Sequence, residues 1–129
     1  MTQSEEQGSF NFIEADGIKI AELGPQSAGI ETVQQALDLM AEATYDGAQS
    51  LILYDTQLPA AFFDLSTRLA GDILQKFAQY RVRLAIVGDF SQYPSQPLKA
   101  FIAESNRGNQ IFFVPDKDEA LKRLANQMP

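Results

Sequence analysis

Three aspartates are the residues best placed for chemistry. Asp55 directly follows the run 50–54, and Asp89 follows the run 82–87 after Gly88. Both runs are typical of buried parallel strands. Ligands of open α/β sheets bind beyond the carboxyl ends of such strands, so the two acids predict a crevice if the strands are neighbours. With Asp64 they could then hold a hydrated Mg²⁺. The plainer interpretation is that each acid only ends a buried strand at the solvent side.

A polar stretch, Asp64-Leu-Ser-Thr-Arg68, falls where a helix is expected to begin. Free backbone N–H groups and the helix dipole favour negative charge at such a position. A phosphate on Ser66 or Thr67 would gain hydrogen bonds there and could pair with Arg68, whereas Asp64 would repel it. The alternative is that Asp64 and Ser66 are simply helix caps. The stretch thus predicts either a phosphorylation site or an ordinary cap.

A second polar run, Glu104-Ser-Asn-Arg-Gly108, precedes a strand and therefore belongs to the opposite edge of the sheet. Gly108 is expected to take a left-handed C-cap, and Arg107 suits the negative end of a helix. Alternatively, Glu104, Asn106 and Arg107 contact a ligand or a partner. We expect no catalytic role for this run.

Aromatic residues gather in two loops, Phe62 with Phe63 and Phe90 with Tyr93. One ring of each pair is expected to fill the core. The others would form an exposed apolar patch, which on a soluble domain marks an interface. Phe62 is therefore a candidate partner contact.

Composition excludes several kinds of chemistry. The 129 residues include no Cys and no His, which removes disulfides, thiolate metal sites, and the commonest general base and metal ligand. The phosphate-binding, dinucleotide-binding and nucleophile-elbow motifs are missing as well. We therefore predict no catalytic residues, no cofactor and no resident metal, and enzymatic activity is the weaker hypothesis.

Charge and hydropathy bear on the binding partners and on the cellular location of the protein. A net charge of −7 argues against binding to nucleic acid or to an anionic membrane surface. No uncharged run is long enough to span a bilayer, and the acidic, polar start is unlike a signal peptide. These features predict a cytoplasmic protein.

Hydrophobic periodicity predicts a β-hairpin followed by alternating helices and strands. Residues 10–14 and 18–22 alternate around Asp16-Gly17, a dipeptide that favours a tight primed turn. Helical spacing and caps predict four helices: 32–46, one starting at Asp64 or Ser66, one after Ser95, and one after Asp116. Further strands are expected at 50–54, 82–87 and 111–114, with 51–53 central and parallel to 84–86. The prediction is a mixed, mostly parallel sheet of about five strands in one domain over 9–127, after a flexible tail at 1–8.

Six segments are distinctive enough to compare with known families: Gly17–Glu22, Gln35–Met40, Phe62–Thr67, Asp72–Phe77, Leu84–Phe90 and Phe101–Gly108. They resemble one small bacterial family, catalogued as domain of unknown function 4180. The order of elements is also similar to the STAS fold of anti-sigma-factor antagonists. Those antagonists carry a phosphorylatable serine in an Asp-Ser-Ser-Gly stretch at a helix start, and Ser66 matches that serine.

The resemblance implies a STAS-like regulatory module that binds another protein, with Ser66 or Thr67 as a phosphorylation switch. That other protein would be an unrelated partner or a second copy of the chain. The alternative is a small-molecule-binding domain or a weak enzyme that uses the crevice near Asp55, Asp64 and Asp89.

Overall fold

A β-hairpin opens the fold in the computed structural model, which describes residues 10–25, 27 and 29–125. Strands β1 (Phe10–Ala15) and β2 (Ile18–Leu23) pair antiparallel, with Ile13 opposite Ile20. Asp16 and Gly17 join them with φ values of 53° and 81°. These positive angles are those of a primed turn, which matches the twist of the two strands. The predicted hairpin and its turn are confirmed.

Three parallel strands extend the hairpin into a five-stranded sheet of order β1-β2-β3-β4-β5. They are β3 (Ser50–Tyr54), β4 (Arg83–Val87) and β5 (Ile111–Val114), and β3 lies in the centre. Leu51 is opposite Leu84 in the parallel β3–β4 pair. The predicted mixed α/β sheet is confirmed, including its central strand.

Four α-helices connect and flank these strands in the described part of the chain: α1 (Val33–Tyr45), α2 (Leu69–Gln79), α3 (Gln96–Arg107) and α4 (Lys117–Ala125). Each sequence signal at the start of α1 is confirmed, because Thr32 and Gln35 form a reciprocal capping box. Ser95 caps α3, with its hydroxyl oxygen accepting the N–H of Leu98. None of these helices is long and apolar enough to cross a membrane.

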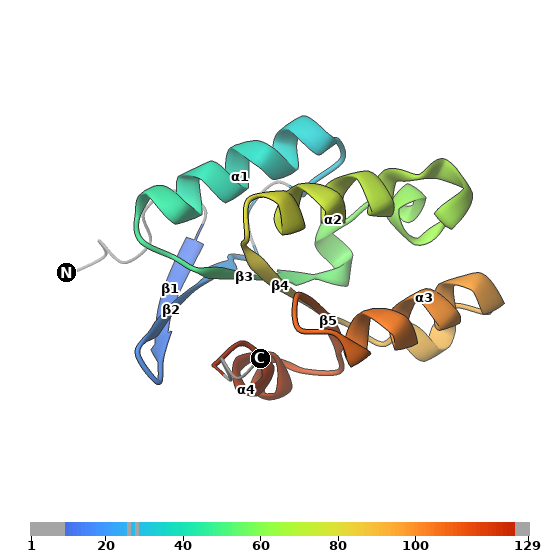
Figure 1. Cartoon of the computed structure of the whole chain (residues 1–129). Coiled ribbons are helices and arrows are strands. Elements are labelled where there is room, and N and C mark those ends of the chain that lie inside the picture. Colours follow the sequence, from blue (N-terminus) through green and yellow to red (C-terminus); the bar gives the residue numbers. More distant parts are fainter. Residues whose placement is uncertain (1–9, 26, 28, 126–129) are drawn as a thin grey trace.

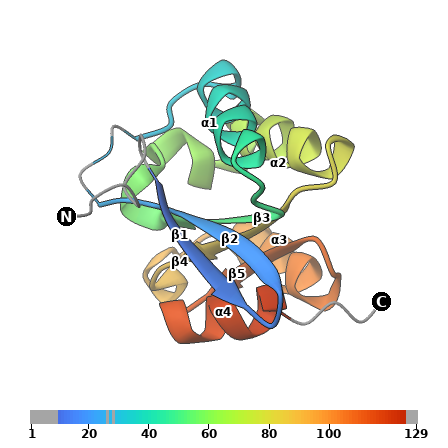
Figure 2. The same ribbon diagram turned by 90° about the vertical axis from the view of Figure 1, so that its left-hand side faces the viewer.

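The two faces of the sheet are covered unequally. Alternate residues such as Leu51 and Leu84 point into a large apolar cluster shared with α1, α2 and α3. Their neighbours Ile52 and Ala85 join a smaller cluster, which only α4 covers among the described helices. Figures 1 and 2 show α1 and α2 side by side on one side of the sheet and α4 on the other.

Two predicted caps are wrong. Asp64 and Ser66 do not cap α2, which begins at Leu69, because a separate 3-10 turn, η4 (Leu65–Thr67), comes first. Gly108 ends α3 with φ −89° and ψ −161°, so its backbone is extended and not left-handed. The expected tail over 1–8 lies outside the described residues, as does the predicted domain end at 127.

Candidate functional site

Residues 55–68 connect β3 to α2. This is the longest of the connections that lead from a strand to an α-helix at the carboxyl edge of the sheet. We call it the β3–α2 segment. It folds into three successive 3-10 turns, η2 (Asp55–Gln57), η3 (Ala60–Phe63) and η4. Most connections in compact domains are shorter, and longer ones that stay ordered are commonly functional. The segment is therefore a candidate site.

Gln57 anchors the base of the segment. Its side-chain amide donates to the carbonyl oxygens of Leu23 and Gly24 at 3.2 and 2.9 Å. Its side-chain oxygen accepts the N–H of Tyr54 at 2.8 Å. Its own backbone carbonyl accepts the N–H of Ile30 at 2.8 Å. One buried side chain thus joins the segment to the ends of β2 and β3, which fixes its position.

Phe62 and Phe63 anchor the middle of the segment. Their exposed fractions are 1% and 6%, so both rings lie in the core. Phe63 stacks on Tyr93 at a centroid distance of 4.8 Å and touches Phe90 at 6.1 Å. The prediction that one ring of the pair is exposed is wrong, and Phe62 supports the segment from below instead of contacting a partner. Phe90 and Tyr93 are half-buried in the same stack.

The outer end of the segment, Asp64 to Arg68, presents exposed polar groups; we call it the tip. The N–H and the hydroxyl of Ser66 both donate to one oxygen of Asp64, at 3.1 and 2.7 Å. These two bonds lower the pKa of the Asp64 carboxyl, the hydroxyl bond more than the N–H bond. Ser66 itself is exposed. Its hydroxyl is therefore accessible to solvent while it is held against a carboxylate.

Thr67 is bound more tightly to the segment than Ser66. Its hydroxyl lies 2.6 Å from the carbonyl oxygen of Ala61 and 2.9 Å from that of Asp64. It also accepts the N–H of Leu69 at 3.2 Å, at the first turn of α2. The hydroxyl that accepts a backbone N–H at the start of α2 is thus that of Thr67. The sequence pattern did not indicate Thr67 as a cap.

Arg68 takes a backbone conformation that favours glycine. Its φ of 69° lies in the left-handed region, which side chains with a Cβ adopt at a cost. Its side chain is exposed, and among the described residues it makes no ion pair. The kink at Arg68 turns the chain from η4 into α2 and leaves the guanidinium at the tip.

The loop after β4 contains a second turn of the same construction. Ser91 donates to one oxygen of Asp89 from its N–H at 3.2 Å and from its hydroxyl at 2.6 Å. This turn begins η5 (Phe90–Gln92), and both of its polar residues are exposed. Asp89 is therefore a cap of its own loop, as Asp64 is of the tip.

Asp55 occupies a different environment at the end of β3. It is half-buried beside Gly88, where an added Cβ would lie 2.5 Å from the Asp55 carboxyl. Burial, and then the charge of Asp55, raise the pKa of the Tyr93 phenol. Within the described residues no three acidic side chains are placed to hold a metal ion. The magnesium alternative for Asp55, Asp64 and Asp89 therefore gains no support.

The run at 104–108 has a structural role at the amino edge of the sheet. The Asn106 amide donates to the carbonyl of Phe113 and its side-chain oxygen accepts the Phe113 N–H, at 3.1 and 2.8 Å. Glu104 and Arg107 form an exposed ion pair at 2.6 Å, one turn apart on α3. Asn106 thus fastens α3 to β5, and its side chain is not free to meet a ligand.

Comparison with known proteins places the chain in a family. A family described as a domain of unknown function (DUF4180) matches residues 15–124. The chain belongs to this family. No curated protein matches the chain significantly, and neither does any solved structure. The family resemblance read from the sequence is confirmed, whereas the STAS relationship stays a prediction.

One polar cluster of this DUF4180 chain was missed by sequence reasoning. Glu22 is buried on the α4 face, where its carboxylate accepts the Tyr54 hydroxyl at 2.7 Å. The Asn11 amide and the Lys117 ammonium also donate to it, each at 3.1 Å. The signal was available, because Glu22 falls on the register of Ile18 and Ile20, the apolar side of β2.

Burial and these hydrogen bonds act on the two groups of the cluster in opposite ways. Burial alone would raise the pKa of Glu22, but the bonds from Tyr54, Asn11 and Lys117 together lower it below the usual range. Burial and the bond to Glu22 raise the pKa of Tyr54. The cluster therefore pairs a charged carboxylate with a neutral phenol. Its hydrogen bonds join β1, β2, β3 and α4 at the carboxyl edge of the sheet.

Proposed function

We propose that this protein is a regulatory module that binds another protein through the tip of the β3–α2 segment. Ser66 is its phosphorylation site. The observation that carries the proposal is the exposed Ser66 hydroxyl, which donates to Asp64 at 2.7 Å on a segment whose base is anchored in the core. A modifying enzyme can reach such a hydroxyl, and the anchored base limits the change to the tip.

Phosphorylation would change the tip electrostatically. A phosphate brings a charge of about −1.5 to −2 and removes the hydroxyl proton. The hydrogen bond from Ser66 to Asp64 would be lost, and a dianion would face the carboxylate. Repulsion would then open the turn, while Arg68, two residues further along the chain, offers an exposed opposite charge.

A further observation supports Ser66 in this role. The hydroxyl of Thr67 is committed to backbone groups of the segment, so its modification would disrupt the start of α2. This favours Ser66 as the residue that switches the tip without unfolding it.

The test compares Ser66 with its structural twin Ser91. Partners crosslinked in the native cells to the wild-type protein, S66D and S91D are quantified by mass spectrometry. We expect S66D to change recovery of a specific partner about tenfold. S91D is the matched control, because it disturbs the same kind of turn at a different place, and it should leave recovery unchanged. Equal recovery with all three proteins, or equal effects of S66D and S91D, would contradict the proposal.

The small-molecule alternative has less support from the geometry. Asp64 and Asp89 each bind their own turn, and Asp55 fills the space above Gly88. A thermal-shift screen against metabolites tests this alternative. A metabolite that stabilises the wild-type protein but not Asp55→Asn would favour it over the proposed protein interaction.

A further inference from the structure

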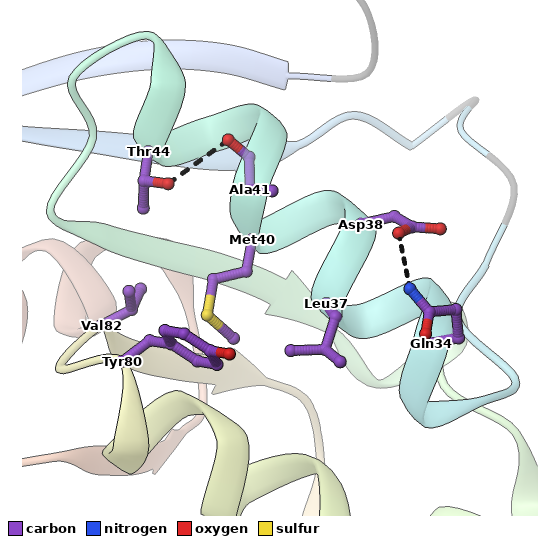
Figure 3. Close-up of a pocket in the computed structure, with 8 residues that line it drawn as sticks. All are labelled: Gln34, Leu37, Asp38, Met40, Ala41, Thr44, Tyr80 and Val82. Atoms are coloured by element: carbon purple, nitrogen blue, oxygen red, sulfur yellow. Dashed lines mark hydrogen bonds between the residues drawn. The ribbon is translucent and has the colours of Figure 1, made fainter.

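An open groove lies between α1 and the end of α2, at the amino edge of the sheet and away from the tip. It has a volume of about 520 Å³. Met40 and Val82, which are 3% and 4% exposed, form its floor, and Leu37 and Tyr80 form its walls. Figure 3 shows the side chains of these four residues directed toward one another across the gap between the two helices. We call this feature the α1–α2 groove.

The exposed apolar side chains of the protein gather around this groove. Among the described residues, the large hydrophobic side chains that are mostly exposed are Tyr45 and Tyr80, at 90% and 57%. Tyr80 lines the groove. Tyr45 follows the lining residue Ala41 by four residues on α1, so it lies one turn further along the same side of the helix. Tyrosine is enriched where proteins bind each other.

The lining residue Asp38 is acidic, whereas basic residues flank the lining residue Tyr80 in the sequence. On α1 the rim residue is Asp38, whose carboxylate accepts the neutral Gln34 amide at 2.9 Å and pairs with no cation among the described residues. Helix α1 contains no Lys or Arg. On α2, Lys76 precedes Tyr80 by one helical turn and therefore lies on the same side, and Arg81 follows Tyr80 directly.

The separation of charge extends beyond the groove. Residues 1–67 contain eleven acids and one base, whereas residues 68–129 contain six acids and nine bases. A surface that joins the acidic helix α1 to the basic residues Lys76 and Arg81 beside Tyr80 is complementary to itself. A twofold axis along the groove brings α1 of one copy opposite α2 of the other.

We propose that the α1–α2 groove binds a second copy of this chain and forms a twofold symmetric dimer. Tyr80 of each copy enters the groove of the other, above Met40 and Leu37. Asp38 of each copy faces Lys76 of the other, and the contact occurs twice by symmetry. The dimer leaves the tip of the β3–α2 segment free, so it goes beyond the proposed partner binding and does not depend on it.

Sedimentation equilibrium of the full chain tests the apolar part of the interface. We expect a monomer–dimer equilibrium for the wild-type protein and a dimer dissociation constant about tenfold or more higher for Tyr80→Ala. A wild-type protein that stays monomeric up to its solubility limit overturns the proposal. So does a dimer that Tyr80→Ala leaves unchanged, since it would use another surface.

A charge exchange tests the pairing itself. D38K places like charges at both contacts, as does K76E, so each variant alone should dimerise about tenfold or more weakly. An equimolar mixture of the two restores dimerisation. In the mixed dimer the introduced lysine of one variant meets the introduced glutamate of the other, and the unchanged Asp38 meets the unchanged Lys76. The recovery also shows that both variants are folded.

The matched controls are charge reversals at exposed positions far from the groove, Asp118→Lys on α4 and Lys99→Glu on α3. They alter net charge by the same amounts as D38K and K76E, and both should dimerise as the wild-type protein does. A mixture of D38K and K76E that remains monomeric, or controls that weaken dimerisation equally, would refute the proposed contact.

Discussion

The two ends of the α1–α2 layer differ in the kind of side chain that they expose. At the carboxyl edge, the β3–α2 segment buries its aromatic rings and exposes polar groups that bind one another. At the amino edge, the α1–α2 groove leaves Tyr80 exposed above an apolar floor. The side chains of Asp64, Ser66 and Thr67 are hydrogen-bonded within the segment, whereas the groove has apolar surface that nothing in the described chain covers.

This difference separates two ways in which a small domain can take part in recognition. A closed, polar tip gains or loses a partner when one group changes its charge, because there is little apolar surface to bind constitutively. An open apolar groove binds by excluding water and needs no modification. The two proposals therefore place regulation at the carboxyl edge and self-association that needs no modification at the amino edge.

Truncation of one aromatic ring at each end gives the largest expected contrast. Phe62→Ala removes a ring that is 1% exposed and should lower the free energy of unfolding by about 3–5 kcal/mol. Tyr80→Ala removes a mostly exposed ring and should change the stability of the monomer by at most about 0.5 kcal/mol. Chemical denaturation at low protein concentration measures both. Similar losses would mean that the two ends are packed alike.

The close approach of Gly29 to Gln57 gives the next largest effect. A Cβ at position 29 would lie 2.8 Å from the backbone oxygen of Gln57, which accepts the Ile30 N–H. Gly29→Ala should therefore destabilise the protein by about 1–3 kcal/mol. Gly71 in α2 has open space around it, so Gly71→Ala should stabilise by about 0.5–1 kcal/mol. A neutral Gly29→Ala would show that Gln57 does not hold the base of the segment.

The pH dependence of stability probes the polar cluster behind the carboxyl edge. The pKa of Glu22 is lower in the folded protein than in the unfolded chain. Its stabilising effect is therefore complete above the unfolded pKa, about 4.3, and is lost as the pH falls through the folded pKa. Glu22→Gln should cost about 1 kcal/mol at pH 7 and flatten the acid limb of the stability curve. Parallel acid limbs for the two proteins would contradict a charged, bonded Glu22.

The smallest expected effect concerns the tip. Ser66→Ala keeps the backbone bond to Asp64 and loses only an exposed hydroxyl bond, so stability should change by no more than about 0.5 kcal/mol. Denaturation curves of Ser66→Ala and Ser91→Ala should nearly overlay. A loss well above about 1 kcal/mol for Ser66→Ala alone would make Ser66 a structural cap.

Regular elements could be predicted because their side chains repeat with the backbone. The alternation around Asp16-Gly17 and the Thr32–Gln35 capping box each specify a local structure, and both are confirmed. The central β3–β4 pair followed from two apolar runs of strand length. Such signals are local, so they can be recognised without knowledge of the tertiary fold.

The β3–α2 segment could not be predicted in the same way. Its 3-10 turns have no hydrophobic period, so Phe62 and Phe63 looked like one buried and one exposed ring. The cap at Asp64 was assigned to α2 because the intervening turn η4 leaves no pattern of its own. The α1–α2 groove depends on how far two helices stand apart, which no single segment encodes.

Phosphorylation-site mapping of the protein isolated from its native cells tests the central claim most directly. Mass spectrometry would measure the phosphate occupancy of Ser66 and of Ser91, two exposed serines whose hydroxyls each donate to an aspartate. We predict phosphate on Ser66 under at least one growth condition and none on Ser91. A Ser66 that is unmodified under every condition, or a Ser91 modified to the same extent, would contradict the assignment of regulation to the tip.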